Sequence, residues 1–196
     1  MDDLKGKVVL ITGASTGIGA ATALAFGEQG ARVAVHYNAS KTQAERVCAE
    51  IRAAGGEAAP VQGDVTQPGV PEAVVAATIA GFGRIDVLIN NAGGLVRRTR
   101  IADYSDEFVL TVLQLNILQV CAFMRVAVPQ MRAQGAGCIV NVSSVAARTG
   151  GAHRLGALCG GEGVHLDGDA QLGQGAFGGS DPRQRHRTGR DPDTVP

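Results

Sequence analysis

The sequence lacks tryptophan and has few aromatic residues, few cysteines and no net charge. Its 18 basic and 18 acidic side chains balance, so no net electrostatic field favours nucleic acid or an anionic membrane surface. The four cysteines show no C-x-x-C spacing and the first residues are charged, which favours free thiols in a reducing cytoplasm. No apolar run approaches the ~20 residues of a membrane span. These absences predict a cytoplasmic domain that binds a small neutral ligand or a nucleotide.

Residues 7–19, KVVLITGASTGIG, are the stretch around which the rest of the chain is organised. An apolar run at 8–11 is followed by a glycine-rich turn and then by an alanine-rich helical stretch at 20–29. This order predicts a strand, a phosphate loop and a helix whose N-terminal N–H groups and dipole bind a dinucleotide. The residues expected beside the phosphates are Gly13, Ser15, Thr16, Gly17, Ile18 and Gly19.

The three glycines of this loop have different expected roles. Gly13 permits a tight turn, Gly17 removes a Cβ where a pyrophosphate approaches the backbone, and Gly19 lets the helix pack closely on the strand. A glycine cluster is also common in ordinary loops, so the later motifs decide between the two interpretations.

Apolar strand-like and helix-like segments then alternate along the chain. Nearly all-apolar short strands are typical of a parallel sheet that is buried on both faces. We therefore predict an α/β fold with a Rossmann-like, doubly wound parallel sheet, incomplete at five strands in the order 3-2-1-4-5. The further strands are expected at 33–37, 58–62, 85–89 and 138–143, and the further helices at 41–54, 71–82 and 106–132, with a kink or break at Pro129.

Residues 1–150 thus form the expected dinucleotide-binding domain, whereas 151–196 are rich in Gly and Arg without sustained apolar periodicity. Their composition predicts a disordered tail of low order.

Five motifs in order resemble the short-chain dehydrogenase/reductase family. They are TGASTGIG at 12–19, Asp64-Val65, NNAG at 90–93, Asn116 in the long helix and IVNVSS at 139–144. The resemblance covers about three quarters of the chain and implies a hydride transfer between NAD(P)(H) and a carbonyl or alcohol substrate. It also implies a homo-oligomer for the full-length form.

The resemblance implies a role for each matching residue, with an ordinary loop or strand-end role as the alternative in each case. Asp64 and Val65 hold the adenine. Asn91, Ala92 and Gly93 line the ribose and nicotinamide side. Asn116 orders a proton-relay water and Ser144 hydrogen-bonds the substrate oxygen. Asn116 and Ser144 are therefore the catalytic candidates.

The second strand ends His36-Tyr37-Asn38, with no acidic residue to bind a ribose 2′-hydroxyl. Tyr37, Asn38 and Ser40 are expected around this ribose, where Lys41 could meet a 2′-phosphate. NADP(H) is therefore favoured over NAD(H). The alternative is that Lys41 is an ordinary charge at a helix start.

The proton donor of the family, a Tyr followed four residues later by Lys, is missing. The chain has only Tyr37 and Tyr104, both before Ser144 and neither in that pattern. Three hypotheses follow: an oxidoreductase in its intended full-length form, a catalytically deficient NAD(P)-binding fragment, or a truncated chain that folds poorly and has no function.

We hypothesise that a one-nucleotide frameshift near Ala152-His153, either a mutation of the gene or a sequencing error, accounts for this absence. Shifted by one nucleotide, the degenerate codons of 158–163 permit Tyr-Ala-Ala-Ala-Lys, those of 171–176 permit SLAKEL, and those of 181–189 permit IRVNAIAPG. All three are similar to the family's continuation after its serine. Residues 151–196 are therefore interpreted as out-of-frame sequence.

Two weaker signals remain. The arginines of 97–100 could face a substrate or form a solvated charge run. His165, Asp167 and Asp169 have a loosely metal-like spacing, but residues read out of frame have no selected geometry, so no metal site is expected.

The long helix has apolar residues at too many angles for one buried face. In the family this helix is covered by segments that follow and contributes to the dimer interface. We therefore expect a marginal fold, an exposed apolar patch and aggregation. The residues concerned are Leu113, Leu115, Ile117, Val120 and Phe123.

Overall fold

The computed structural model describes residues 4–144 of the 196-residue chain. The end of the predicted domain and the predicted tail at 151–196 lie outside the described residues. Five parallel strands form one sheet in the order β3-β2-β1-β4-β5, which confirms the predicted fold class and strand order. The strands are β1 Val8–Ile11, β2 Arg32–Tyr37, β3 Glu57–Gln62, β4 Val87–Asn90 and β5 Cys138–Asn141.

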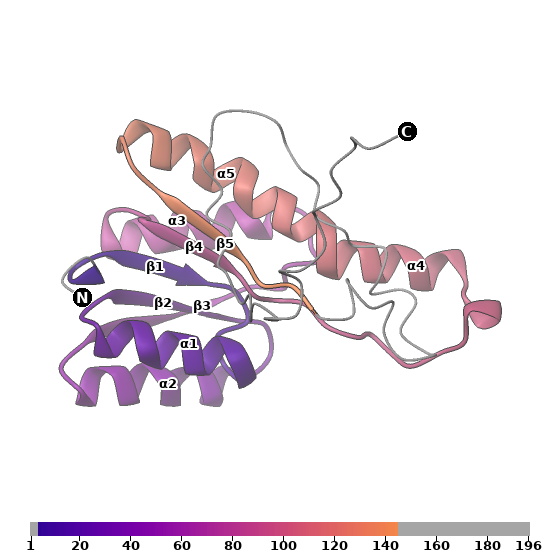
Figure 1. Cartoon of the computed structure of the whole chain (residues 1–196), viewed down its shortest axis with the longest axis horizontal. Helices are drawn as coiled ribbons and strands as arrows, with labels where there is room; N and C mark the ends of the chain where they lie inside the picture. The colour runs from indigo at the N-terminus through magenta and orange to yellow at the C-terminus, as the bar shows by residue number, and fades with distance from the viewer. Residues whose placement is uncertain (1–3, 145–196) are drawn as a thin grey trace, which may run out of the picture.

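Helices cover both faces of this sheet (Figure 1). Helices α1 Gly17–Glu28 and α2 Lys41–Ala53 lie on one face, and α3 Val70–Phe82 and α5 Gln119–Ala133 on the other. The β1 side chains alternate between two apolar cores, with Val9 and Ile11 on the α1 and α2 side and Val8 and Leu10 on the α3 and α5 side. The order reverses between β1 and β4, so the ligand crevice is expected at their carboxyl ends.

The long helix is interrupted before Pro129 rather than at it. Helix α4, Asp106–Leu113, continues into a π-helical segment, Gln114–Leu118, and then into α5, which runs through Pro129. The predicted break at Pro129 is therefore wrong, while the alternative of a kink there stays a prediction. Pro129 is exposed, as is Arg125, whose carbonyl finds no helical N–H partner at the proline. The π-helical segment contains Asn116, one of the predicted site residues. Such segments occur frequently at functional sites.

The helical stretch Asp106–Ala133 is long and apolar enough to cross a membrane by length and composition, with a mean hydropathy of 1.7 in its most apolar window. The sequence prediction considered uninterrupted apolar runs and missed this property. A core helix of a soluble protein passes the same test. Here Phe123, Ala127 and Met131 of α5 are buried in the core between the helix and the sheet, but only 17% of the most apolar window is buried, so the core accounts for part of the apolar composition.

The remaining apolar residues of this stretch are covered unevenly. Phe123 is fully buried, whereas Leu110 is 62% and Leu118 50% exposed. Neither leucine is among the five residues that the sequence singled out, so the expected apolar patch stays a prediction. The other four residues that the sequence singled out are half-buried: Leu113, Leu115, Ile117 and Val120.

Replacing the exposed Leu110 by Lys tests the predicted link between this patch and aggregation. We expect Leu110→Lys to reduce light scattering on warming without lowering the melting temperature, because the side chain gains little from burial. Val112, on the same helix but 4% exposed, is the matched control, and Val112→Lys should unfold the chain. Unchanged scattering in Leu110→Lys would contradict a role of this face in aggregation.

Candidate nucleotide site

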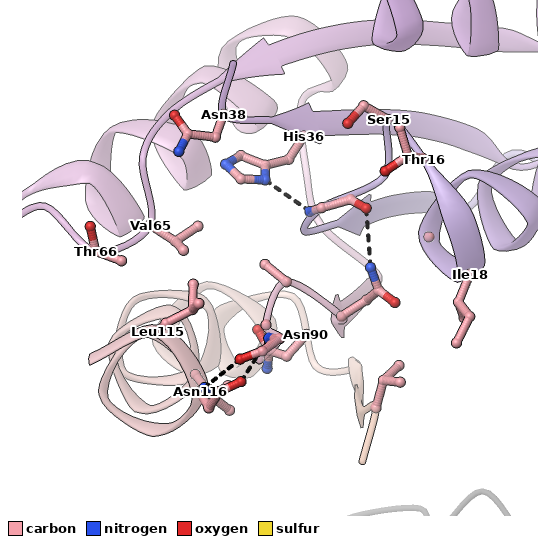
Figure 2. A pocket seen from close by; sticks show the side chains of 18 of the residues that line it. Ser15, Thr16, Ile18, His36, Asn38, Val65, Thr66, Asn90, Leu115 and Asn116 are labelled. Atoms are coloured by element: carbon pink, nitrogen blue, oxygen red, sulfur yellow. Dashed lines mark hydrogen bonds between the residues drawn. The ribbon is translucent and has the colours of Figure 1, made fainter. Parts of the chain in front are cut away.

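A cleft of about 900 Å³ lies at the carboxyl ends of the strands, beside the switch between β1 and β4 (Figure 2). Its volume is within the range of ligand and cofactor sites. The phosphate loop, the ends of β2 and β3, the loop after β4 and the π-helical segment contribute to its wall. The predicted residues that line it are Gly13, Ser15, Thr16, Ile18, Gly19, Asn38, Ser40, Asp64, Val65, Asn91, Ala92, Gly93, Asn116 and Ser144.

Two predicted cofactor residues, Tyr37 and Gly17, do not line this cleft. Tyr37 is 8% exposed and packs in the core with α1 and α2. Successive strand residues point to opposite faces, and His36 faces the cleft. The expectation that the Tyr37 side chain lies beside the ribose is therefore corrected, because this side chain packs in the core. Gly17 is the first residue of α1, with a positive φ of 56° and no atom within 4 Å of a would-be Cβ.

Thr12 joins the phosphate loop to the loop after β4. Its Oγ1 accepts hydrogen bonds from the backbone N–H groups of Asn91 and Ala92, both at 2.9 Å. In return, the Asn91 side-chain amide donates to the carbonyl oxygens of Thr12 at 2.9 Å and Gly13 at 3.1 Å. The Asn91 side chain thus holds the loop after β4 against the phosphate loop, and these two bonds use both of its amide protons.

Gly19 is required by close packing at the same place. A Cβ there would overlap the carbonyl oxygen of Gly13 and lie 2.5 Å from Asn91 Nδ2. The helix N-terminus can approach the strand only without that atom, as the sequence predicts. The N-cap of α1 is Thr16, whose side chain makes no capping bond, so its hydroxyl remains available to a ligand.

His36 is buried at the end of β2 and hydrogen-bonds through both ring nitrogens. Nδ1 lies 3.0 Å from the backbone nitrogen of Gly13 (Figure 2). Nε2 lies 3.0 Å from the carbonyl oxygen of Gly63. Burial lowers the pKa of His36 to about 4 against the favourable effect of the Gly63 carbonyl and Asp64. The imidazole is therefore neutral at physiological pH.

Asp64 both lines the cleft and caps the turn after β3. Its Oδ1 accepts from the Thr66 hydroxyl at 2.7 Å and from the Thr66 N–H at 3.0 Å. These bonds hold the pKa of Asp64 below its usual value, so the side chain is a carboxylate. The structure thus shows the ordinary turn role, and the bonds to Thr66 use only one carboxylate oxygen. The cofactor role of Asp64 stays a prediction.

The π-helical segment positions the other side of the cleft. Asn116 Oδ1 accepts from the Gly94 N–H at 2.8 Å, and its Nδ2 donates to the carbonyls of Gly94 and Val112. One turn later, the fully buried Gln119 donates to the Ala92 carbonyl at 2.8 Å. Both amides therefore hold the loop that follows β4 against the long helix.

Sequence reasoning missed the roles of Thr12, His36 and Gln119. Thr12 precedes the first loop glycine at a strand end, and His36 lies within a run of apolar strand residues. In both cases a polar side chain in a buried strand indicates a hydrogen-bonding duty. Gln119 had no comparable signal.

The arginines of 97–100 do not line the cleft. The Arg97 guanidinium lies 4.8 Å from the centre of the Phe108 ring. Within residues 4–144, no group of three potential metal ligands lies close enough to hold an ion. His165, Asp167 and Asp169 are outside the described residues.

A doubly wound parallel sheet with a glycine-rich loop and a helix N-terminus at its switch point defines a dinucleotide-binding domain. The family model described as short chain dehydrogenase matches residues 7–156. The chain therefore belongs to the short-chain dehydrogenase family.

Named relatives and solved structures agree with this membership. A 3-oxoacyl-[acyl-carrier-protein] reductase of Synechocystis sp. is 41% identical over 150 residues, covering 76% of this chain and 60% of that protein. An L-rhamnose 1-dehydrogenase (NAD(P)(+)) of Sphingomonas sp. is 39% identical over 152 residues, covering 77% of this chain and 59% of that protein. The NADH-dependent reductase A1-R′ complexed with NAD is 35% identical, with a TM-score of 0.76 over 81% of this chain and 68% of that one. The chain spans about three fifths of the length of these curated relatives.

Thr12→Val should destabilise the chain by about 2–4 kcal/mol, because it leaves the N–H groups of Asn91 and Ala92 without their acceptor. Thr12→Ser keeps the hydroxyl and is the matched control, which should lose less than half as much. Urea unfolding followed by circular dichroism measures both. Equal losses in the two variants would assign the effect to the methyl group instead.

Acid should destabilise the chain through His36. In the unfolded chain the imidazole of His36 takes up a proton with a pKa near 6.5. In the folded chain burial lowers this pKa to about 4. Stability is therefore full above pH 6.5 and falls as the pH drops through this window, by about 3 kcal/mol in total. Urea unfolding at pH 7.5 and 4.5 should show a smaller loss in His36→Asn than in the wild type. The same loss in both would contradict the assignment.

Proposed function

We propose that the chain is the cofactor-binding part of an oxidoreductase that transfers a hydride between NADP(H) and a carbonyl or alcohol substrate in its intended full-length form. The observation that carries this proposal is one cleft lined by the phosphate loop, the NNAG loop, Asn116 and Ser144. The comparisons support a nicotinamide nucleotide as the cofactor. When bound, this group supplies or accepts the hydride.

The residues of this chain would bind and orient the reactants. The N–H groups at the start of α1 face the phosphates, and Asn91 holds the loop on the nicotinamide side. Ser144 would hydrogen-bond the substrate oxygen while the carbon beside it gains or loses the hydride. Asn116 would hold the proton-relay water. The proton itself needs a donor of suitable pKa, which the Tyr and Lys of the family provide and this sequence lacks.

A frameshift near Ala152-His153 remains our explanation for the missing Tyr and Lys. The second candidate function is an NAD(P)-binding fragment without catalysis. The shifted codons of 158–163 restore Tyr-x-x-x-Lys at one place. Resequencing the gene across codons 150–160 tests this directly, since an unbroken read of the present frame would contradict it. The partners we propose are a small carbonyl or alcohol substrate and, for the full-length form, further copies of the same chain, in the cytoplasm.

The polypeptide as given should have negligible dehydrogenase activity, because loss of general acid catalysis typically costs ~10²- to 10⁴-fold. Frame repair should restore turnover of NADPH against a panel of ketones. In the repaired protein, Ser144→Ala should remove most of that activity, while Ser143→Ala, one residue earlier in the same cleft, is the matched control. Turnover by the unrepaired chain near that of the repaired one would contradict the proposal.

The preference for NADP(H) rests on Asn38 and Ser40, which line the cleft without an acidic neighbour at the end of β2. Lys41 does not line the cleft and pairs with Glu45 at 3.7 Å, so the 2′-phosphate would depend on neutral donors. We expect NADPH to bind tighter than NADH, and Asn38→Asp to reverse the order by charge repulsion, with Asn38→Ser as the uncharged control. Calorimetric titration measures all three. Tighter binding of NADH by the wild type would contradict this preference.

A further inference from the structure

His36 connects two loops on different sides of the cleft. Its imidazole bonds to the Gly13 N–H through Nδ1 and to the Gly63 carbonyl through Nε2, each at 3.0 Å. Backbone bonds reinforce both links, since Ala14 N–H donates to the His36 carbonyl at 2.7 Å and Gly63 N–H to the Tyr37 carbonyl at 2.9 Å. The end of β2 therefore fixes the phosphate loop and the loop after β3 together.

The partners determine the protonation of the ring. A backbone N–H can only donate, so Nδ1 must be the unprotonated acceptor, and a carbonyl can only accept, so Nε2 must carry the proton. A charged imidazole would place an Nδ1–H against the Gly13 N–H. The contact with Gly13 is therefore made by the neutral Nε2–H form alone.

The surroundings leave His36 little freedom to adjust. The Phe123 ring of α5 packs edge-on against the imidazole, with centroids 6.2 Å apart. Gly63 is enclosed by Val70 and Val74 of α3, which lie 2.6 and 2.9 Å from a would-be Cβ. Of the described residues, Asp64 is the ionisable group whose charge acts on the ring.

We propose that His36 is a positioning residue of the nucleotide site, which in its neutral Nε2–H form holds the Gly13 backbone and with it the phosphate loop. This inference rests on the proposed nucleotide-binding function. Because Gly13 N–H is used by His36, the phosphates must be bound by the loop N–H groups that follow. Protonation of His36 would release Gly13, and because the pKa of His36 is about 4, nucleotide affinity is lost by this route only below about pH 5.

Three variants separate the two ring contacts. Asn places an amide oxygen near the position of Nδ1 and does not titrate, so His36→Asn keeps the acceptor for Gly13. Gln places its amide nitrogen near Nε2, so His36→Gln keeps the contact with Gly63. His36→Leu removes both contacts and retains an apolar volume.

Calorimetric titration of the full chain with NADPH at pH 7.5 and 5.0 tests the proposal. We expect His36→Asn to bind within about threefold of the wild type, and His36→Leu and His36→Gln at least about tenfold more weakly, because the Gly13 N–H then lacks its acceptor. The pKa of about 4 keeps His36 neutral at both pH values, so the wild type and His36→Asn should show nearly the same pH dependence. Binding by His36→Leu as tight as by His36→Asn, or a clearly larger loss of affinity at pH 5.0 in the wild type than in His36→Asn, would overturn it.

A second measurement reads the ring of the wild type itself. Nitrogen-15 NMR of labelled histidine gives the tautomer of His36, and His36→Asn is needed only to identify which signal belongs to it. We expect Nε2–H at pH 7, and an Nδ1–H or charged ring would overturn the proposal. A wild-type chain that binds neither NADPH nor NADH would contradict the proposed function instead, while this spectrum would still decide the state of His36.

Discussion

The hydrogen bonds between Thr12 and the loop after β4 are the interaction on which the site depends. Strands β1 and β4 are neighbours in the sheet, yet their cofactor loops are about 80 residues apart in the sequence. Backbone pairing ends with the strands, so the loops need side chains to hold them in register. Thr12 and Asn91 supply four such bonds across the switch point, where a dinucleotide must contact both loops at once.

The other cofactor loops are tied to this pair by buried polar side chains. His36 links the phosphate loop to the loop after β3, and Asn116 and Gln119 link the loop after β4 to the long helix. In each case a largely apolar strand or helix carries, near the cleft, one polar side chain that makes the hydrogen bonds to the loop. This arrangement lets the sheet fix the positions of the loops, while leaving N–H groups at the start of α1 for a ligand.

The sequence predicts the sheet because its signals are local and repeated. Apolar strands such as Val8–Ile11 alternate with helices, and right-handed crossovers then allow few strand orders. The same local signals failed where tertiary contacts decide. Pro129 predicts a kink or break, yet α5 continues through it on the exposed side of the helix. The π-helical segment around Asn116 has no sequence periodicity that would predict it. Most cleft residues were predictable because they follow strands, whereas Tyr37 shows that strand position alone does not give the face.

The central claim is that these loops form one nicotinamide-nucleotide site at the switch between β1 and β4. Titration of nitrogen-15-labelled chain with NADPH, followed by amide chemical shifts, tests it most directly. The account predicts concentration-dependent shifts at Ser15, Thr16, Asp64 and Asn91, and none on the outer face of α2 around Arg46. Shifts confined to other parts of the chain, or no shifts at millimolar NADPH, would contradict it.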